Sequence, residues 1–344
     1  MAEPIDWGLA RSTGIRTAGG VRGARGPRSG PDVSPADAAE AVAALRQAAV
    51  DVQGPVADIT GLYAPPEAPA HVVDRAEWVR SNVSSLATLV APMAGRVGSS
   101  PMQAVTAKVG AVQVGLALGW LSSKVLGQYE VLPGEGDAPR LLLVAPNIVT
   151  AGTEMDVDLG EFGRWVCMHE ETHRVQFGAV PWLPDFFRTN VTALVDDLDV
   201  GPGEVMSRIA SGMRGGAPGG VAAWVQSPAG RERLERLLGL MTLVEGHADW
   251  VMDQSGDVIP SAPQLRAEFE ARRRAGGVLD NMIRKVLGMD AKLAQYRDGA
   301  AFVRHVTGAV GRDEFNLVWT SPETLPTLAE IHQPDSWIDR VVRG

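Results

Sequence analysis

The stretch that decides the fold is Trp165-Val-Cys-Met-His-Glu-Glu-Thr-His-Arg-Val-Gln-Phe177, which contains the pattern His169-Glu170-x-x-His173. On a helix, residues four apart lie one above the other, so two neutral imidazoles at this spacing can bind one zinc ion. Glu170 is turned by about a hundred degrees from His169 and can reach a water bound to the metal. The ion lowers the pKa of that water, and the glutamate accepts its proton. The stretch therefore predicts a helix with a metal site and a general base.

Apolar residues precede the two histidines on the same helical stripe. The members of this stripe are Phe162, Val166, His169, His173 and Gln176. Their spacing is that of one helix face. A lone histidine on such a face is usually a packed core residue. Two stacked histidines with no other obvious partner indicate that both bind the same ion.

A second helix is expected around Leu234–Asp253, and its apolar stripe is interrupted by Glu245. An unpaired carboxylate on a buried face would protonate or destabilise the fold by several kcal/mol, and a dication would remove this cost. Asp249 lies one turn later on the same side, where it can accept the second ring N–H of a ligating histidine and define its tautomer. His247 faces roughly the opposite way, so Glu245 is favoured over it as a third ligand.

His169-Glu170-x-x-His173 followed by Glu245-x-x-x-Asp249 is similar to the gluzincin pattern of thermolysin-like metallopeptidases. The resemblance implies that His169, His173 and Glu245 bind one Zn²⁺ per chain. It also implies that Glu170 is the general base and that Asp249 is the partner of a ligating histidine. The 72-residue interval from His173 to Glu245 is longer than in the thermolysin type. This difference from the family pattern affects the assignment of Glu245 as a ligand and not the assignment of the two histidines.

Nearly the whole chain resembles a family of zincin-like metallopeptidases, mostly actinobacterial, that is often labelled as associated with biosynthesis of a deazaflavin coenzyme. That label reflects genomic association and not a reaction. The stretches that resemble the family, besides the metal helix, are Asp6–Ala10, Val73–Val79, Val125–Tyr129, Pro146–Ile148, Lys292–Gly299 and Trp319–Glu323. We expect a mainly α (α+β) fold, in which a zincin-like helical catalytic core contains a small β-sheet.

Composition sets the limits of this prediction. The 344 residues are 45% hydrophobic and 21% charged, which describes a soluble globular chain with an ample core. We expect an N-terminal, mainly helical region, 1–135, packed on a metal-binding catalytic region, 136–344. The net charge of −9 argues against a nucleic-acid partner, because phosphate binding needs clustered positive charge. The single cysteine, Cys167, permits no intramolecular disulfide and is expected to be a packed thiol.

Three segments bear on location and surface. Residues 1–10 contain acids and no apolar core of a secretory signal, which predicts a cytoplasmic protein. Residues 11–32 alternate arginine with glycine, serine and proline, and are expected to be a mobile surface segment rather than a nucleic-acid arm. Residues 109–123 are uncharged but short for a membrane span, so a buried helix and no transmembrane segment are expected.

Local signals predict further elements. Helices are expected at 36–52, 55–62 and 75–90, and a strand at Arg140–Ala145. Leu143–Ile148 could be the rim of a substrate cleft or simply a buried strand. The glycine-rich segment 211–220 could be a lid or a surface insertion.

The expected function is hydrolysis of a peptide bond in a peptide or protein substrate, with Glu170 taking the proton of the attacking water. Tyr296 and His305 are candidates for steadying the oxyanion, and Asn147 is a candidate substrate contact. The alternative is a non-catalytic, zinc-stabilised scaffold that binds a peptide or protein partner in the same cleft. A scaffold needs zinc ligands but no general base, so the presence of Glu170 favours the enzyme.

Overall fold

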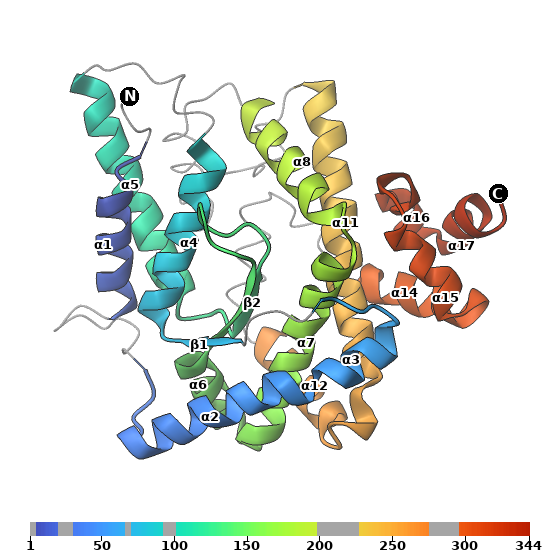
Figure 1. Cartoon of the computed structure of the whole chain (residues 1–344), viewed down its shortest axis with the longest axis horizontal. Coiled ribbons are helices and arrows are strands. Elements are labelled where there is room, and N and C mark those ends of the chain that lie inside the picture. The colour runs from blue at the N-terminus through green and yellow to red at the C-terminus, as the bar shows by residue number, and fades with distance from the viewer. Residues whose placement is uncertain (1–4, 20–29, 66–69, 92–100, 198–226, 275–295) are drawn as a thin grey trace.

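The computed structural model describes residues 5–19, 30–65, 70–91, 101–197, 227–274 and 296–344. In this part of the chain, helices surround one three-stranded sheet (Figure 1), which confirms the expected mainly helical fold with a small sheet. The longer helices are α1 (Trp7–Ala18), α2 (Pro35–Asp51), α3 (Gln53–Thr60), α4 (Arg75–Val90), α5 (Pro101–Leu121), α6 (Ala145–Met155), α7 (Leu159–Ala179), α8 (Leu183–Asp197), α11 (Pro228–Asp253), α12 (Ala262–Arg274) and α14 (Tyr296–Val310). The strands are β1 (His71–Val73), β2 (Gly127–Glu130) and β3 (Arg140–Val144), and the short C-terminal helices are α15 (Arg312–Phe315), α16 (Leu328–His332) and α17 (Pro334–Trp337).

The predicted strand at residue 140 is the centre of the sheet. The strand order is β1-β3-β2, with β1 parallel and β2 antiparallel to β3. Both edges of β3 are therefore occupied, and its run Leu141–Val144 is buried, as expected for an apolar strand covered on both faces. The interpretation of Leu143–Ile148 as a cleft rim is corrected, because β3 cannot pair with another chain and Ile148 belongs to α6. The edge strands are β1 and β2.

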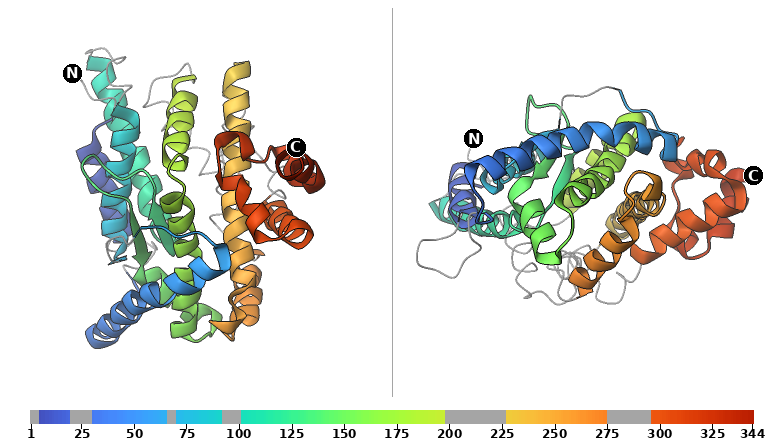
Figure 2. Two further views of the ribbon diagram at one scale, coloured as in Figure 1. Left: turned by 45° about the vertical axis from the view of Figure 1, so that its right-hand side comes forward. Right: turned by 90° about the horizontal axis from the view of Figure 1, so that it is seen from below.

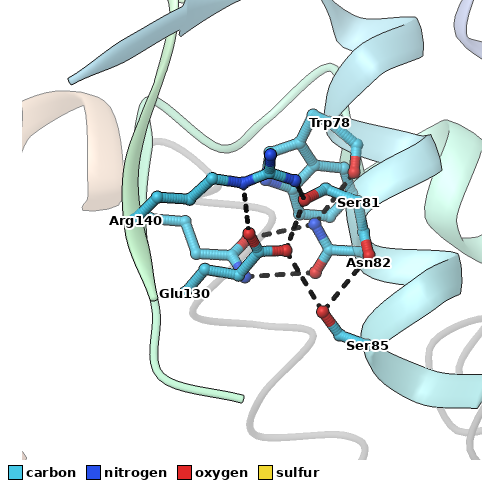
Figure 3. Close-up of polar contacts among 7 residues, drawn as sticks. Trp78, Ser81, Asn82, Ser85, Glu130 and Arg140 are labelled. Carbon is cyan, nitrogen blue, oxygen red and sulfur yellow. Dashed lines mark hydrogen bonds and ion pairs between the residues drawn. The ribbon is translucent and has the colours of Figure 1, made fainter. Parts of the chain in front are cut away.

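A buried polar network ties β2 to α4 (Figure 3). The carboxylate of Glu130, which is 2% exposed, accepts hydrogen bonds from Arg140 Nε at 2.8 Å, from Ser85 Oγ at 3.1 Å and from the Ser81 hydroxyl. Next to Ser81, the Asn82 amide pairs with Gln128 of β2 at 3.2 Å. Because an unpaired buried carboxylate is costly, this network determines where the edge strand lies against α4.

The helices α7 and α11 form the middle of the molecule. Asp158 caps α7 by accepting from the Glu161 N–H, and Ser227 caps α11 with proline at its first position. Both helices are buried on most of their surface, and they contact each other. In all views, α14 to α17 lie at the end of the molecule opposite to α1 and α5 (Figures 1 and 2).

The expected helices at 36–52, 55–62 and 75–90 are confirmed as α2, α3 and α4. The proposed division at residue 135 falls between β2 and β3, two strands that pair in one sheet. The sheet thus contains strands from both predicted regions, and the division into regions stays a prediction.

The N-terminal segment differs from the expectation. Residues 7–18 form α1, whose Asp6 cap accepts from the Leu9 N–H, and the helix packs on α5. The interpretation of residues 11–18 as a mobile surface segment is wrong, because small residues let the two backbones approach closely. A Cβ on Gly115 would lie 2.4 Å from the carbonyl oxygen of Ala10. Residues 20–29 lie outside the described part of the chain.

The helix α5 is also less buried than expected. It packs on α1 and α4 along one side, while four apolar side chains on another side are exposed: Val105, Val109, Val112 and Leu116. Among the residues that the structure describes, α5 is the one helix whose length and composition would allow it to cross a membrane, and 33% of its window Ala104–Leu121 is buried. The expectation of a fully buried core helix is corrected to a helix packed on one side.

Candidate metal centre

Two helices bring three metal-ligating side chains to one point. The ring nitrogens His169 Nε2 and His173 Nε2 of α7 lie 3.2 Å apart. The carboxylate of Glu245 on α11 approaches them, with Oε2 at 3.6 Å from His169 Nε2 and Oε1 at 3.8 Å from His173 Nε2. The three ligand atoms all lie within 4.8 Å of one another. This geometry matches the one expected if these three residues share an ion.

The chemistry of these donors suits zinc. Two imidazole nitrogens and one carboxylate oxygen form a His₂Glu ligand set of the kind that leaves a fourth position for water. The electrostatics also favour a cation. Burial lowers the pKa of His169, but the carboxylate of Glu245 and the charges of Glu170 and Asp249 outweigh it and raise this pKa to about 9. The residues present therefore fit a zinc ion.

Glu245 is more exposed than its place in an apolar stripe predicts. Its side chain is 38% exposed, and Met241 and Asp249, one turn away on either side, are also only partly buried. These three residues form the open line of residues 237–252 of α11, which are otherwise buried. The carboxylate thus meets the histidines at an accessible surface, and the cost of burying an unpaired charge is smaller than expected.

Glu170 lies between α7 and the edge strand β2. It is buried, and a Cβ on Gly127 would lie 2.5 Å from Glu170 Cγ. Burial raises the pKa of Glu170, while His169, His173 and a hydrogen bond from the backbone N–H of Tyr129 oppose this shift. A carboxylate with a raised pKa next to a metal site is suited to accept a proton.

The partner of His173 is Gln176, which belongs to the predicted stripe and had no expected role. Gln176 Oε1 lies 2.9 Å from His173 Nδ1. Asp249 was expected to accept the second ring N–H of a ligating histidine, and for His173 this position is occupied by Gln176. The expectation therefore stays a prediction for His169. The charge of Asp249 also raises the pKa of His169. The signal for Gln176 was its position three residues after His173 on the same helix face.

His247 lies on the far side of α11, as expected. It is fully buried, and its ring stacks on Trp250 and contacts Phe315 and Trp319. Burial, and then the nearby His173, lower its pKa to about 3. His247 is therefore a neutral core residue and does not compete with Glu245 for the metal.

The remaining candidate residues have other surroundings. Asn147 is buried, donates to the carbonyl oxygens of Ser122 and Val125, and accepts from Arg75 Nε at 2.7 Å. These bonds correct its interpretation as a substrate contact, because both ends of the amide are used within the fold.

His305 of α14 is exposed and pairs with Asp335 at 2.9 Å, which favours a structural role. The Tyr296 side chain and the segment 211–220 lie outside the described residues. Cys167 is fully buried, as expected for a packed thiol, and its Sγ lies 3.9 Å from the carbonyl oxygen of Leu45.

The helix with His169-Glu170-x-x-His173, the carboxylate from a second helix and the glutamate beside an edge strand define the class of zincin-type metal sites. The chain belongs to the family of zincin-like metallopeptidases, which matches residues 5–338. It is also similar to a protein from Chloroflexus aurantiacus whose crystal structure was described as that of a candidate hydrolase with a novel fold. That chain is 29% identical, each chain is covered to 99%, and the TM-score is 0.70. No curated protein matches the chain.

Proposed function

We propose that this member of the family is a zinc-dependent peptidase in which His169, His173 and Glu245 hold the metal and Glu170 is the general base. The observation that supports this most is the meeting of three ligand atoms within 4.8 Å, with the buried Glu170 on the same helix. Zn²⁺ at this site would supply a water of lowered pKa and polarise the carbonyl of the scissile bond. Glu170 then accepts the proton of the attacking water and passes it to the leaving amine.

The edge strand gives this proposal a place for the substrate backbone. The inner edge of β2 pairs with β3, and its outer edge lies next to Glu170. Since the N–H of Tyr129 already donates to Glu170, the backbone of Gly127 is where an extended peptide would add to the sheet. Such pairing would hold the scissile carbonyl beside the general base.

The test combines metal analysis with cleavage of an unbiased peptide library. The wild type is expected to contain one Zn²⁺ per chain and to cleave peptides. Glu170→Gln should keep the metal and lose about a hundredfold or more in rate, because an amide cannot accept the proton. The control Glu232→Gln changes an exposed glutamate of α11 and should leave the zinc content and the cleavage rate unchanged.

Three results would contradict the proposal. A wild type that contains no zinc after metal reconstitution would remove the metal site. Zinc binding with equal cleavage by wild type and Glu170→Gln would remove the assigned base. Zinc-dependent peptide binding without any cleavage would favour the scaffold. We also propose a cytoplasmic location and an association with deazaflavin biosynthesis.

A further inference from the structure

Gln176 is fully buried at the contact between the two helices that provide the ligands. On one side, its Oε1 lies 2.9 Å from His173 Nδ1. On the other side, its Nε2 lies 2.9 Å from the carbonyl oxygen of Val244 and 3.0 Å from His247 Nδ1. Val244 directly precedes the third ligand, Glu245. One amide therefore links a ligating histidine on α7 to the backbone beside the ligand on α11.

The carbonyl of Val244 determines which way this amide points. A backbone carbonyl oxygen only accepts hydrogen bonds, so the atom 2.9 Å from it has to be the NH₂ group of Gln176. The reversed amide would place two oxygens against each other in a buried place, which is costly. The oxygen of the amide therefore faces His173.

This orientation has a consequence for the proton on His173. An amide oxygen also only accepts, so the nitrogen that faces it, Nδ1, has to bear the hydrogen. In the neutral ring the lone pair is then on Nε2, the nitrogen that lies 3.8 Å from Glu245 and 3.2 Å from His169 Nε2. The nitrogen directed at the metal site is thus the one that can bind a metal.

We propose that Gln176 is a positioning residue that selects the metal-binding tautomer of His173, and that the Val244 carbonyl holds Gln176 in the required orientation. The zinc in this statement rests on the proposed function, whereas the tautomer is a property of the metal-free protein. Loss of a partner of a ligating histidine typically weakens metal binding ten- to hundredfold.

The first experiment measures zinc affinity by competition with a chromogenic chelator. Gln176→Met keeps the length of the side chain but removes its hydrogen bonds, and it should weaken zinc binding by about ten- to hundredfold. The matched control is Thr172→Val on the same helix, which loses one buried hydrogen bond to the Met168 carbonyl and should bind zinc as the wild type does. The absorption spectrum of the Co²⁺-loaded Gln176→Met protein should also change, because the ring is free to turn. Equal zinc affinity in Gln176→Met and Thr172→Val would overturn the proposal.

The second experiment determines the tautomer directly in the wild-type protein, so it does not depend on whether a variant folds. In the ¹⁵N-labelled, metal-free wild type, at a pH where the ring is neutral, two-bond ¹H–¹⁵N couplings should show His173 protonated on Nδ1. A ring protonated on Nε2 would overturn the proposal, whatever the peptidase assay shows. Conversely, the expected tautomer in a protein that neither binds zinc nor cleaves peptides would leave the role of Gln176 intact and remove the proposed function.

Discussion

In the proposed mechanism, the carboxylate of Glu170 has to reach a water at the metal, and the absence of a side chain at Gly127 makes room for this carboxylate. The ideal Cβ position on this glycine lies 2.5 Å from Cγ, 2.7 Å from Cδ and 2.8 Å from Oε1 of Glu170. The N–H of Tyr129, two residues further along β2, donates to the same carboxylate. The first residues of β2 thus define the position of Glu170, the proposed general base.

Gly127→Ala should therefore displace Glu170 and lower peptide cleavage. A shift of about 1 Å at a catalytic group can cost about a hundredfold in rate, while zinc content should stay that of the wild type. The control is Gly54→Ala in α3, where a Cβ meets nothing within 4 Å. Wild-type cleavage rates in Gly127→Ala would show that Glu170 does not depend on this contact.

Glu245 and Asp249 of α11 should differ in their effect on zinc binding. Glu245→Ala removes a ligand atom and should weaken zinc binding strongly. Asp249→Ala should weaken it by about ten- to hundredfold, because the three ligands remain and only the orientation of His169 is freed. Competition with a chelator measures the zinc affinity of both variants. A larger loss of affinity in Asp249→Ala than in Glu245→Ala would contradict the ligand assignment.

At the scale of elements, close backbone approach joins the N-terminal helix to the rest of the fold. α1 and α5 pack through glycines, since a Cβ on Gly115 would lie 2.4 Å from the carbonyl oxygen of Ala10 and one on Gly119 would lie 2.6 Å from that of Gly14. This packing also explains why an arginine-rich segment is helical: residues 10, 13, 14 and 18 of α1 are buried against its neighbours.

Gly115→Ala should separate these helices and destabilise the protein. We expect a loss of about 1–3 kcal/mol, the usual cost of overpacking a tight contact, seen as a lower midpoint of thermal unfolding. Gly308→Ala in α14 is the matched control, because a Cβ there meets nothing within 4 Å. Replacing a helix glycine in open space with alanine should stabilise the protein by up to about 1 kcal/mol. Equal stability of the two variants would argue against the α1–α5 contact.

At the scale of the whole molecule, the C-terminal segment covers the side of α11 that faces away from the candidate metal centre. Phe315 and Trp319 pack on the ring of His247, and the Trp319 carbonyl accepts from Trp182 Nε1 at 2.9 Å. Arg340 then holds the last turns by donating to Glu330 at 2.6 Å and to the Glu323 carbonyl at 2.6 Å. The environment behind the ligand helices thus depends on residues near the end of the chain.

The Glu330–Arg340 pair should make stability depend on pH. Burial raises the pKa of Glu330, but the bonds from Arg340 and Thr327 outweigh it and lower the pKa below its usual value. A lowered folded-state pKa adds stability above the unfolded pKa of about 4.3, and this stability is lost as the pH falls through the folded pKa. Glu330→Gln should unfold at a lower temperature than the wild type at neutral pH, and the difference should shrink in acid. A difference that grows with falling pH would contradict this assignment.

The amino-acid sequence by itself determined the elements whose signals are local. The spacing of His169 and His173 follows from the helix repeat, the helix at 75–90 was predicted from local signals and is α4, and β3 follows from its apolar run. Even Glu245 was found this way, because a carboxylate in an apolar helical stripe is unusual wherever the helix lies.

The tertiary structure decided which of these elements meet. It showed that β3 is the central strand and β2 an edge strand, that Gln176 contacts His173 Nδ1, and that the segment after Trp7 is helical. The Gln176 contact to the Val244 carbonyl joins residues 68 positions apart, and no local periodicity encodes such a pair. Strand order, the orientation of a buried amide and the packing of α1 on α5 all depend on which surfaces of distant segments are complementary, and only the folded chain brings those surfaces together.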